Sequence, residues 1–568
     1  MKSILTVLFA ICFLSAQPQS GAGQVKFNRG DTLRGDLSEM RLCYDVLFYD
    51  LDIKVDIEKK FLSGANTIRF LVVNDFKTFQ IDLFKNMNIE KIVFNKQDVL
   101  FRREFNAVFV EFPDTIRKGN TASITVHYSG KPIEAKNAPW DGGFSWSRDK
   151  RKKPFVGVSC QGTGASLWWP CKDHQSDEPN EMMIRITVPP GLKDVSNGKL
   201  LREIALPDGW TKFEWYVSYP INNYDVTLNI ANYVHFGDSF IHAGYKDTLS
   251  LDYYVLPENL EKARKQFEQV KPMMDCYYGL FGEYPFLKDG YKLVEAPYLG
   301  MEHQSCIAYG NKYRNGYLGI DMSGTGNRFD YIIIHESAHE WWGNSITTTD
   351  IADMWIHEGF TTYSEALYVE CLYGYDSYID YINSEKSKVQ NDEPMVGKWG
   401  LNNEGSGDMY PKGALVIHTI RSIMNDEVKF FKMLREIQVK FRYKTITSHD
   451  VESFISQYAG LDLSEVFDLY LRTTMIPELV IEYERDRTDL VIYYFYNMKG
   501  RKGFDMPVQI TIEKNKYELI FPDSKRKKII LKDMKVEDFK IATELFYLNT
   551  KLIDLDQQGS YQLQNETE

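Results

Sequence analysis

The segment HESAHEWWGNSITTTDIADMWIHE, residues 335–358, decides how the rest of the chain is interpreted. His335 and His339 are four residues apart, so on a helix they share one face and can converge on one ion. Glu336 stands where a general base for a metal-bound water would sit. Two imidazoles plus the carboxylate of Glu358, with the fourth position open, form the ligand set of a catalytic zinc site. The segment therefore predicts one zinc ion per chain, held by His335, His339 and Glu358.

The HExxH pattern alone also fits a solvated or salt-bridged helix face. The preceding residues favour a buried helix, because residues 331–334 (YIII) form an apolar run. Asn327 and Asp330 resemble a capping box at its start, and Gly343 with Asn344 suits its end. Buried histidines and a buried glutamate need a neutralising partner, which a metal supplies. A structural zinc would usually have four protein ligands, often cysteines, and none lies between residues 307 and 370.

Composition and charge restrict the class of protein. A length of 568 residues predicts about two to four domains, and 43% hydrophobic residues are enough for large cores. The net charge of −12 argues against a general nucleic-acid binder. Two short basic clusters, residues 148–153 and 525–528, are interpreted as solvated loops. Beyond the first residues, no segment is apolar enough to span a bilayer, so we expect no transmembrane segment.

The first residues resemble an export signal. Lys2 precedes an apolar run over residues 4–14, and Ser15-Ala16-Gln17 follows it. This pattern predicts a secretory signal peptide over residues 1–16 and therefore a periplasmic or secreted protein. Six of the seven cysteines lie after this segment. Export permits disulfides, but the sequence establishes none, and it does not indicate the oligomeric state.

Three regions of different periodicity follow. Alternating apolar residues, such as Leu51, Ile53 and Val55, and the lack of a useful helical period predict a β domain over residues 17–236. Residues 237–476 are mainly helical in pattern, with an amphipathic stretch over residues 258–278. Alternation returns after Pro477 and predicts a small β-sandwich over residues 477–568. The expected fold class is therefore an α+β multidomain protein.

The metal segment also resembles a known family. HESAHEWWGN followed by WIHEGFTTYSE, with eighteen residues between His339 and Glu358, is similar to the zinc aminopeptidases that include aminopeptidase N and leukotriene hydrolase. The resemblance continues in order along nearly the whole chain. It implies a saddle-like N-terminal β-sheet domain, a thermolysin-like catalytic domain and removal of the N-terminal residue from peptides with a free N-terminus. The chain would be a short, three-domain, exported member.

The resemblance assigns two residues to the substrate amine. Gln161 matches the position that helps to hold the free amine, although its surroundings also fit a plain Gly-rich loop. Glu302 belongs to the motif Gly300-Met301-Glu302, which resembles the exopeptidase motif of the family. A fixed carboxylate binds an ammonium group through charge-assisted hydrogen bonds. Leu299 and His303 replace the residues usual on either side of this motif, and an ordinary surface glutamate is the alternative.

Two further residues carry expected roles. Tyr410 matches the tyrosine that stabilises the tetrahedral oxyanion, and Pro411 replaces the glutamate usual after it. Glu365 lies two helical turns after Glu358. It is a candidate hydrogen-bond partner for a ligand histidine, or a plain structural residue.

Two other functions compete with the aminopeptidase interpretation. A thermolysin-type endopeptidase shares the metal helix, but Glu302 and Gln161 argue against it, because an anchored terminus leaves no room for upstream residues. A non-catalytic binding protein on a peptidase fold is the second, and it is disfavoured because all the expected catalytic residues are present. The residues do not decide the preferred N-terminal residue or an epoxide hydrolase side activity.

Overall fold

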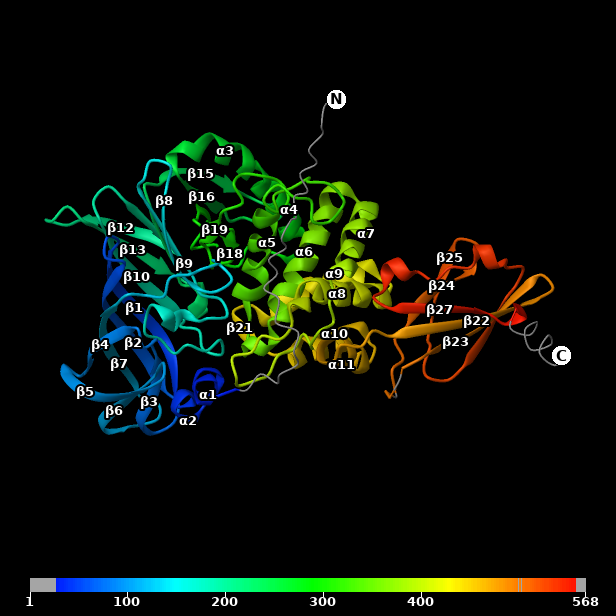
Figure 1. The fold of residues 1–568 in the computed structure, drawn as a ribbon, viewed down its shortest axis with the longest axis horizontal. Coiled ribbons are helices and arrows are strands. Elements are labelled where there is room, and N and C mark those ends of the chain that lie inside the picture. The colour runs from blue at the N-terminus through cyan, green and yellow to red at the C-terminus, as the bar shows by residue number, and fades with distance from the viewer. Residues whose placement is uncertain (1–26, 499, 502, 558–568) are drawn as a thin grey trace, which may run out of the picture.

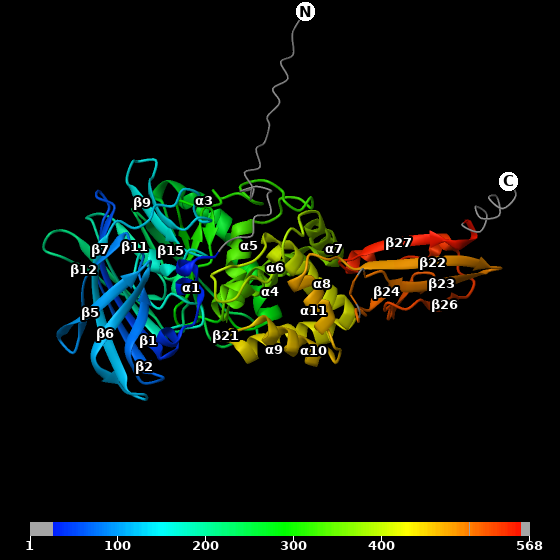
Figure 2. The same ribbon diagram turned by 60° about the horizontal axis from the view of Figure 1, so that its bottom comes forward.

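A computed structural model describes residues 27–498, 500–501 and 503–557. The predicted signal peptide, residues 1–16, lies outside them. The described chain forms three parts in a row, with β-sheets at one end, helices in the middle and further strands at the other end (Figure 1). A second view shows the same order, with the last strands pointing away from the helices (Figure 2). The expected α+β multidomain fold is confirmed.

The first part is a large β-sheet with a smaller sheet beside it. In the described residues the large sheet runs β12-β13-β10-β1-β2-β7-β4-β5-β6-β3. Its strands are β1 (Tyr44–Asp56), β2 (Phe61–Val72), β3 (Phe76–Asp82), β4 (Met87–Phe94), β5 (Gln97–Glu104), β6 (Ala107–Ile116), β7 (Thr121–Gly130), β10 (Glu181–Val188), β12 (Lys199–Ala205) and β13 (Thr211–Val217). The smaller sheet contains β8 (Gly143–Arg148), β9 (Pro154–Ser159), β11 (Lys193–Ser196) and β14 (Leu228–Ala231).

Alternation along β1 explains how the large sheet forms its core. Leu51, Ile53 and Val55 are buried, whereas the residues between them are partly exposed. A strand places successive side chains on opposite faces, so this pattern buries one face only. Two short helices, α1 (Arg29–Gly35) and α2 (Glu39–Leu42), precede β1. The sequence pattern, which showed no useful helical period in this region, did not predict them.

The middle part combines a mixed sheet with helices. The sheet contains β15 (Val234–Phe240), β16 (Leu249–Val255), β17 (Tyr291–Glu295), β18 (Gly300–Met301) and β19 (Ile307–Tyr309), and a short pair joins β20 (Ile346–Thr348) to β21 (Lys444–Ile446). The helices are α3 (Leu260–Gln266), α4 (Val270–Phe281), α5 (Tyr331–Ala338), α6 (Trp355–Tyr373), α7 (Tyr375–Ser384), α8 (Pro411–Met424), α9 (Glu427–Phe441), α10 (Ser448–Ala459) and α11 (Ser464–Arg472). The amphipathic stretch predicted over residues 258–278 is divided between α3 and α4 by a 3₁₀ turn at Phe267–Gln269. The proposed boundary at 236/237 falls inside β15.

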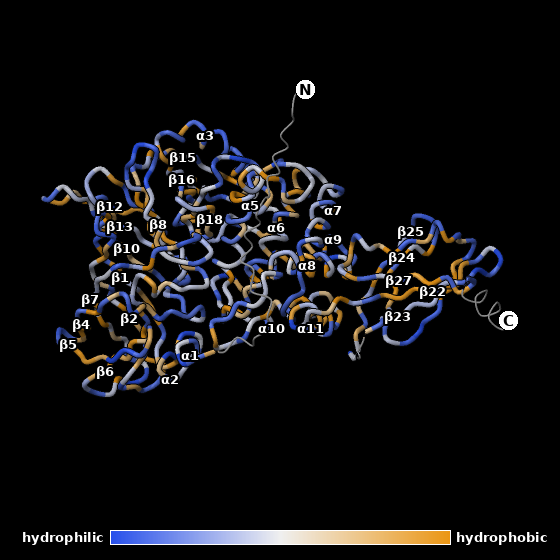
Figure 3. The backbone as a smooth tube through the Cα atoms, viewed as in Figure 1, coloured by the Kyte–Doolittle hydropathy of each residue, from blue (hydrophilic) through white to orange (hydrophobic). Residues whose placement is uncertain are grey.

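The last part contains two small sheets. One is formed by β26 (Lys527–Leu531), β23 (Asp489–Tyr496), β22 (Glu478–Asp486) and β27 (Asn549–Asp554), and the other by β24 (Val508–Glu513) and β25 (Lys516–Ile520). Hydrophobic residues lie along β22, whereas the loop at the outer tip is hydrophilic (Figure 3). These sheets are the expected C-terminal β part.

Packing joins the first two parts directly. Met301, Cys306 and Ala308, from β18, β19 and the turn between them, belong to the same hydrophobic cluster as the large N-terminal sheet. The strand that bears Met301 is therefore buried between the two parts.

A disulfide links Cys276 on α4 to Cys371 on α6. Among the helices of the described residues, none has the length and apolar character needed to cross a membrane.

Candidate metal centre

Helix α5 presents the first two predicted ligands. Asp330 caps its N-terminus, since its carboxylate accepts hydrogen bonds from the backbone N–H groups of Ile332 and Ile333. The predicted cap at Asn327 is wrong, because the helix begins four residues later, at Tyr331. His335 lies on α5 and His339 at its C-cap, so the two imidazoles face the same side.

Helix α6 brings the third ligand to them. Glu358 Oε2 lies 3.6 Å from His335 Nε2 and 3.3 Å from His339 Nε2, and the two nitrogens are 3.3 Å apart. All three side chains are buried. Glu358 Oε2 has no hydrogen-bond partner among the described residues, although it faces two imidazole nitrogens. A cation between the three atoms satisfies all of them, and two nitrogens with one carboxylate oxygen suit zinc. The predicted ligands therefore fit one zinc ion.

Hydrogen bonds behind the imidazoles fix their orientation. His335 Nδ1 donates to Glu365 Oε1 at 2.6 Å, and His339 Nδ1 lies 2.9 Å from the Trp342 carbonyl oxygen. With the Nδ1 atoms engaged in this way, each Nε2 is left to face the ligand position. Of the two roles considered for Glu365, the structure confirms the hydrogen bond with a candidate ligand histidine. Gly343 has a φ of +124°, and a Cβ there would approach His339 Nδ1 to 3.2 Å, so this turn favours glycine.

Glu336 lies beside the ligands in a cavity of about 350 Å³. Gly300 on β18 leaves space for this carboxylate, because a Cβ atom at Gly300 would lie only 2.6 Å from Glu336 Oε1. Burial raises the pKa of Glu336 to about 8. A buried carboxyl with a pKa near neutrality can exchange a proton with a reacting group at physiological pH.

Gln161 and Glu302 meet next to the metal ligands. Gln161 Nε2 donates to Glu302 Oε1 at 2.6 Å and to Glu358 Oε1 at 3.1 Å. The hydroxyl of Tyr224 also donates to Glu302 Oε1, at 3.2 Å. These bonds use the amide N–H groups of Gln161 and leave its carbonyl oxygen as an acceptor. The two residues assigned to the substrate amine therefore form one unit with the ligand Glu358.

Leu299 and His303 replace the usual residues on either side of the amine motif, and only Leu299 lines the cavity. His303 is fully buried and does not line it, and burial lowers the pKa of the imidazole to about 3. His303 is therefore neutral at physiological pH. Leu299, in contrast, contributes to the lining.

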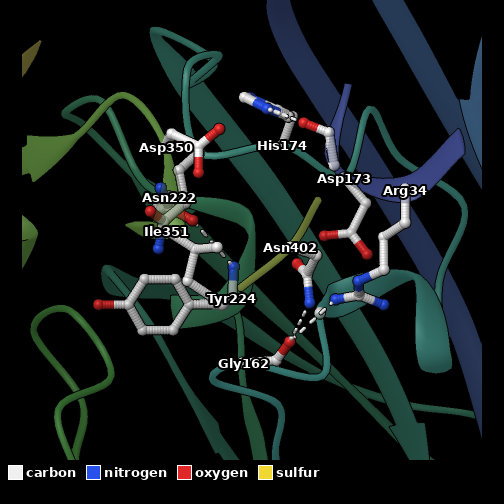
Figure 4. Close-up of a pocket in the computed structure, with 12 residues that line it drawn as sticks. Arg34, Gly162, Asp173, His174, Asn222, Tyr224, Asp350, Ile351 and Asn402 are labelled. Carbon is white, nitrogen blue, oxygen red and sulfur yellow. Dashed lines mark hydrogen bonds between the residues drawn. The ribbon is translucent and has the colours of Figure 1, made fainter. Parts of the chain in front are cut away.

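The loop that carries Gln161 is held from two other segments (Figure 4). Arg34, from α1, donates to the carbonyl oxygen of Gly162 at 3.1 Å, and the Asn402 amide donates to the same oxygen at 3.1 Å. Sequence reasoning did not identify Arg34 or Asn402, because neither belongs to a motif or a periodic stretch. Tyr224 begins an alternating stretch, but alternation gives no indication that its hydroxyl contacts Glu302.

Tyr410 reaches the cavity from the start of α8. It is the N-cap residue of this helix, and its ring stacks on that of His335 with 6.2 Å between centroids. Pro411 occupies the first position of α8, where its missing N–H removes no helical hydrogen bond. The substitution of the usual glutamate therefore preserves the helix start that positions Tyr410.

Two family models match the chain in order. The model described as Peptidase M1 N-terminal domain matches residues 46–224, and the model described as Peptidase family M1 domain matches residues 259–470. The second match contains the three candidate metal ligands. It also contains Glu302, Glu336 and Tyr410, whereas Gln161 lies within the first match.

Named relatives of the chain are aminopeptidases. Glutamyl aminopeptidase of Sus scrofa is 26% identical over 58% of this chain and 36% of that protein. Leucyl aminopeptidase of Saccharolobus solfataricus is 22% identical over 78% of this chain and 55% of that protein. The chain thus spans between about a third and a little over half of these relatives.

Solved structures share the fold. A mutant M1 zinc metallopeptidase from Deinococcus radiodurans, bound to a Tyr-Ser-Ala substrate, has a TM-score of 0.63 at 20% identity and covers 77% of this chain and 96% of that chain. A two-domain M1 zinc metallopeptidase mutant bound to L-tryptophan has a TM-score of 0.62 at 20% identity, with 76% and 95% covered.

Proposed function

Because this chain belongs to the M1 peptidase family, we propose that it is a zinc-dependent aminopeptidase that removes the N-terminal residue from peptides. One observation supports this most strongly. The Gln161 amide bridges Glu302 and Glu358, so an anchor for an ammonium group lies directly beside the ligand of the metal. A peptide held there by its free amino end has its first peptide bond next to the metal position.

His335, His339 and Glu358 would hold the zinc. When bound, zinc supplies a Lewis acid that polarises the scissile carbonyl and lowers the pKa of the attacking water. Glu336 accepts the proton of that water and delivers it to the leaving amine. The missing side chain at Gly300 leaves room for the Glu336 carboxylate, which lies close to His339.

Tyr410 and the amine anchor act at opposite ends of the reacting bond. The Tyr410 hydroxyl donates a hydrogen bond to the oxygen that becomes negative when the carbonyl is attacked. Glu302 and the carbonyl oxygen of Gln161 accept hydrogen bonds from the substrate ammonium. Holding the terminus in this way orients the first peptide bond and raises its effective concentration at the site.

Hydrolysis of blocked peptides separates this function from that of an endopeptidase. We expect a peptide with a free N-terminus to be cleaved and its N-acetylated form not to be cleaved, because acetylation removes the ammonium that Glu302 binds. A zinc chelator should abolish the cleavage, and added zinc should restore it. Comparable cleavage of the free and blocked peptides would instead favour the thermolysin-type endopeptidase. Zinc binding with no cleavage of any peptide would favour a binding protein.

We also propose that the protein is exported to the periplasm or secreted. The signal-like pattern of residues 1–16 supports export, and so does the Cys276–Cys371 disulfide, because disulfides persist mainly in oxidising compartments. Mass spectrometry of the protein recovered from its native cells should find a mature N-terminus at Gln17. Intact Met1 on a protein retained in the cytosol would contradict export.

A further inference from the structure

The cavity contains one carboxylate more than the proposed function uses. Glu302 binds the ammonium, Glu336 transfers the proton and Glu358 binds the metal. A fourth glutamate, Glu404, lines the same cavity. Among the described residues that form its walls there is no lysine or arginine.

Glu404 lies beside the amine anchor. Its Oε2 would be 3.4 Å from a Cβ built on Gly162, the residue next to Gln161. In the described part of the chain its carboxylate has no hydrogen bond or ion pair with another residue. Burial, and then the nearby charge of Glu358, raise the pKa of Glu404. The carboxylate thus lacks a partner in a partly desolvated place.

The segment that carries Glu404 is held firmly. A Cβ on Gly35 would come within 2.3 Å of the Asn402 backbone nitrogen, so α1 packs directly against this segment. The Asn402 amide also donates to the Gly162 carbonyl oxygen, which ties the segment to the Gln161 loop (Figure 4). Because the two loops are joined, the backbone that carries Glu404 lies beside the loop that carries Gln161.

Glu404 is the carboxylate of this cavity for which neither the metal nor the substrate ammonium provides a partner. The cavity walls hold four glutamates and, among the described residues, no lysine or arginine. A partly desolvated carboxylate without a partner is costly, and a hydrogen-bonded cation relieves that cost.

We propose that Glu404 makes the enzyme selective for peptides that begin with arginine or lysine. The side chain of the first residue branches from the carbon that bears the ammonium, so it starts next to Gln161 and can extend to Glu404. Trp140, Leu299 and Met409 provide apolar lining for the methylene stem of a long basic side chain. This inference rests on the proposed aminopeptidase function.

The same charge excludes an acidic first residue. Glutamyl aminopeptidases are among the named relatives, at 26% identity for the one from Sus scrofa. An aspartate or glutamate side chain would add a fifth carboxylate to a cavity whose described walls hold no lysine or arginine. Like charges at close range in a desolvated site oppose binding. We therefore expect glutamyl substrates to be poor here.

Arginine and citrulline provide a test that changes only the charge. The two side chains have nearly the same shape, but citrulline is neutral. With aminoacyl reporter amides, we expect kcat/KM for arginine to exceed that for citrulline by about 10- to 100-fold. In Glu404→Gln this ratio should fall close to one. Glu393→Gln is the matched control, because Glu393 is exposed and lies outside this cavity, and it should keep the wild-type ratio.

Each outcome decides between the proposals. Equal rates for arginine and citrulline in the wild-type enzyme would overturn the selectivity while leaving the aminopeptidase function intact. An unchanged ratio in Glu404→Gln would show that another group selects the cation and would also overturn the role of Glu404. If Glu404→Gln does not fold, inhibition of the wild-type enzyme by argininamide and by citrullinamide gives the same comparison. No hydrolysis of any unblocked substrate would remove the aminopeptidase function itself.

Discussion

At the scale of single residues, the buried ligand atoms and the neighbouring base should respond differently to substitution. His335→Ala and Glu358→Ala each remove a ligand, so we expect zinc and activity to be lost together. Glu336→Gln keeps the shape of the side chain but cannot accept a proton, so zinc should remain while activity is lost. Metal analysis of the purified variants beside a peptidase assay tests this. Full zinc occupancy in both ligand variants would contradict the assigned site.

Glu302 and Tyr410 should differ in the kinetic constant that they affect. The ammonium is charged in the ground state and in the transition state, so replacing Glu302 should raise KM and, through poorer orientation, also lower kcat. Tyr410 meets a charge that exists only after the carbonyl is attacked. Tyr410→Phe should lower kcat by about 100- to 1000-fold with little change in KM.

Steady-state kinetics on zinc-loaded variants measures both effects. Only the hydroxyl is lost in Tyr410→Phe, and the ring can still stack on His335. A near-normal kcat in this variant, with zinc bound, would assign Tyr410 a packing role instead.

At the scale of helices, the site depends on the close contact of α6 with α8. The helices meet at Gly359 and Gly413, and a Cβ on Gly413 would lie 2.7 Å from the Gly359 Cα. Glu358 precedes one of these glycines, and Tyr410 lies one helical turn before the other. The distance between the candidate ligand Glu358 and the proposed oxyanion donor Tyr410 therefore depends on two residues without side chains.

We expect Gly413→Ala to destabilise the protein by about 1–3 kcal/mol, because the new methyl group meets backbone and must push the helices apart. Activity per folded molecule should fall as well, since Tyr410 moves relative to Glu358. Gly279→Ala in α4 is the control, because no atom lies within 4 Å of its added Cβ and alanine favours a helix. Denaturant unfolding measures both variants. Equal stability of Gly413→Ala and the wild type would mean that the helices can separate without cost.

At the scale of the whole molecule, the Cys276–Cys371 bond joins two helices across a sequence separation of 95 residues. Cross-linking such a long loop restricts the unfolded chain, so reduction or the Cys276→Ala/Cys371→Ala double substitution should lower stability by about 2–5 kcal/mol. Thermal unfolding with and without reductant tests this expectation. The double variant is the control, because its stability should not change with reductant. Identical melting of the oxidised and reduced wild type would contradict it.

The local features of the site were predictable from the sequence. His335 and His339 are four residues apart, which matches the helical repeat, so their convergence is a property of the helix itself. Alternation predicted β1 for the same reason, because a strand repeats every two residues. The roles of Gln161, Glu302 and Tyr410 came from a resemblance of short motifs. They remain proposals, although the structure brings these residues into one cavity or beside it.

Only the tertiary structure decided what surrounds those motifs. Arg34 and Asn402 hold the same carbonyl oxygen of Gly162 from sequence separations of 128 and 240 residues. Glu404, two residues after Asn402, lines the cavity, and Cys276 meets Cys371 because α4 packs near α6. Such residues occupy loops or single positions without a repeat, so no local pattern marks them. Their contacts depend on which distant segments the folded cores bring together. For this protein the sequence by itself indicated the fold class and placed the candidate ligands His335 and His339 on one helix face, because both follow from local periodicity, whereas Glu358 was predicted from the spacing of a motif. The folded cores decided which distant residues meet in the cavity, because these residues come together only after long loops have closed.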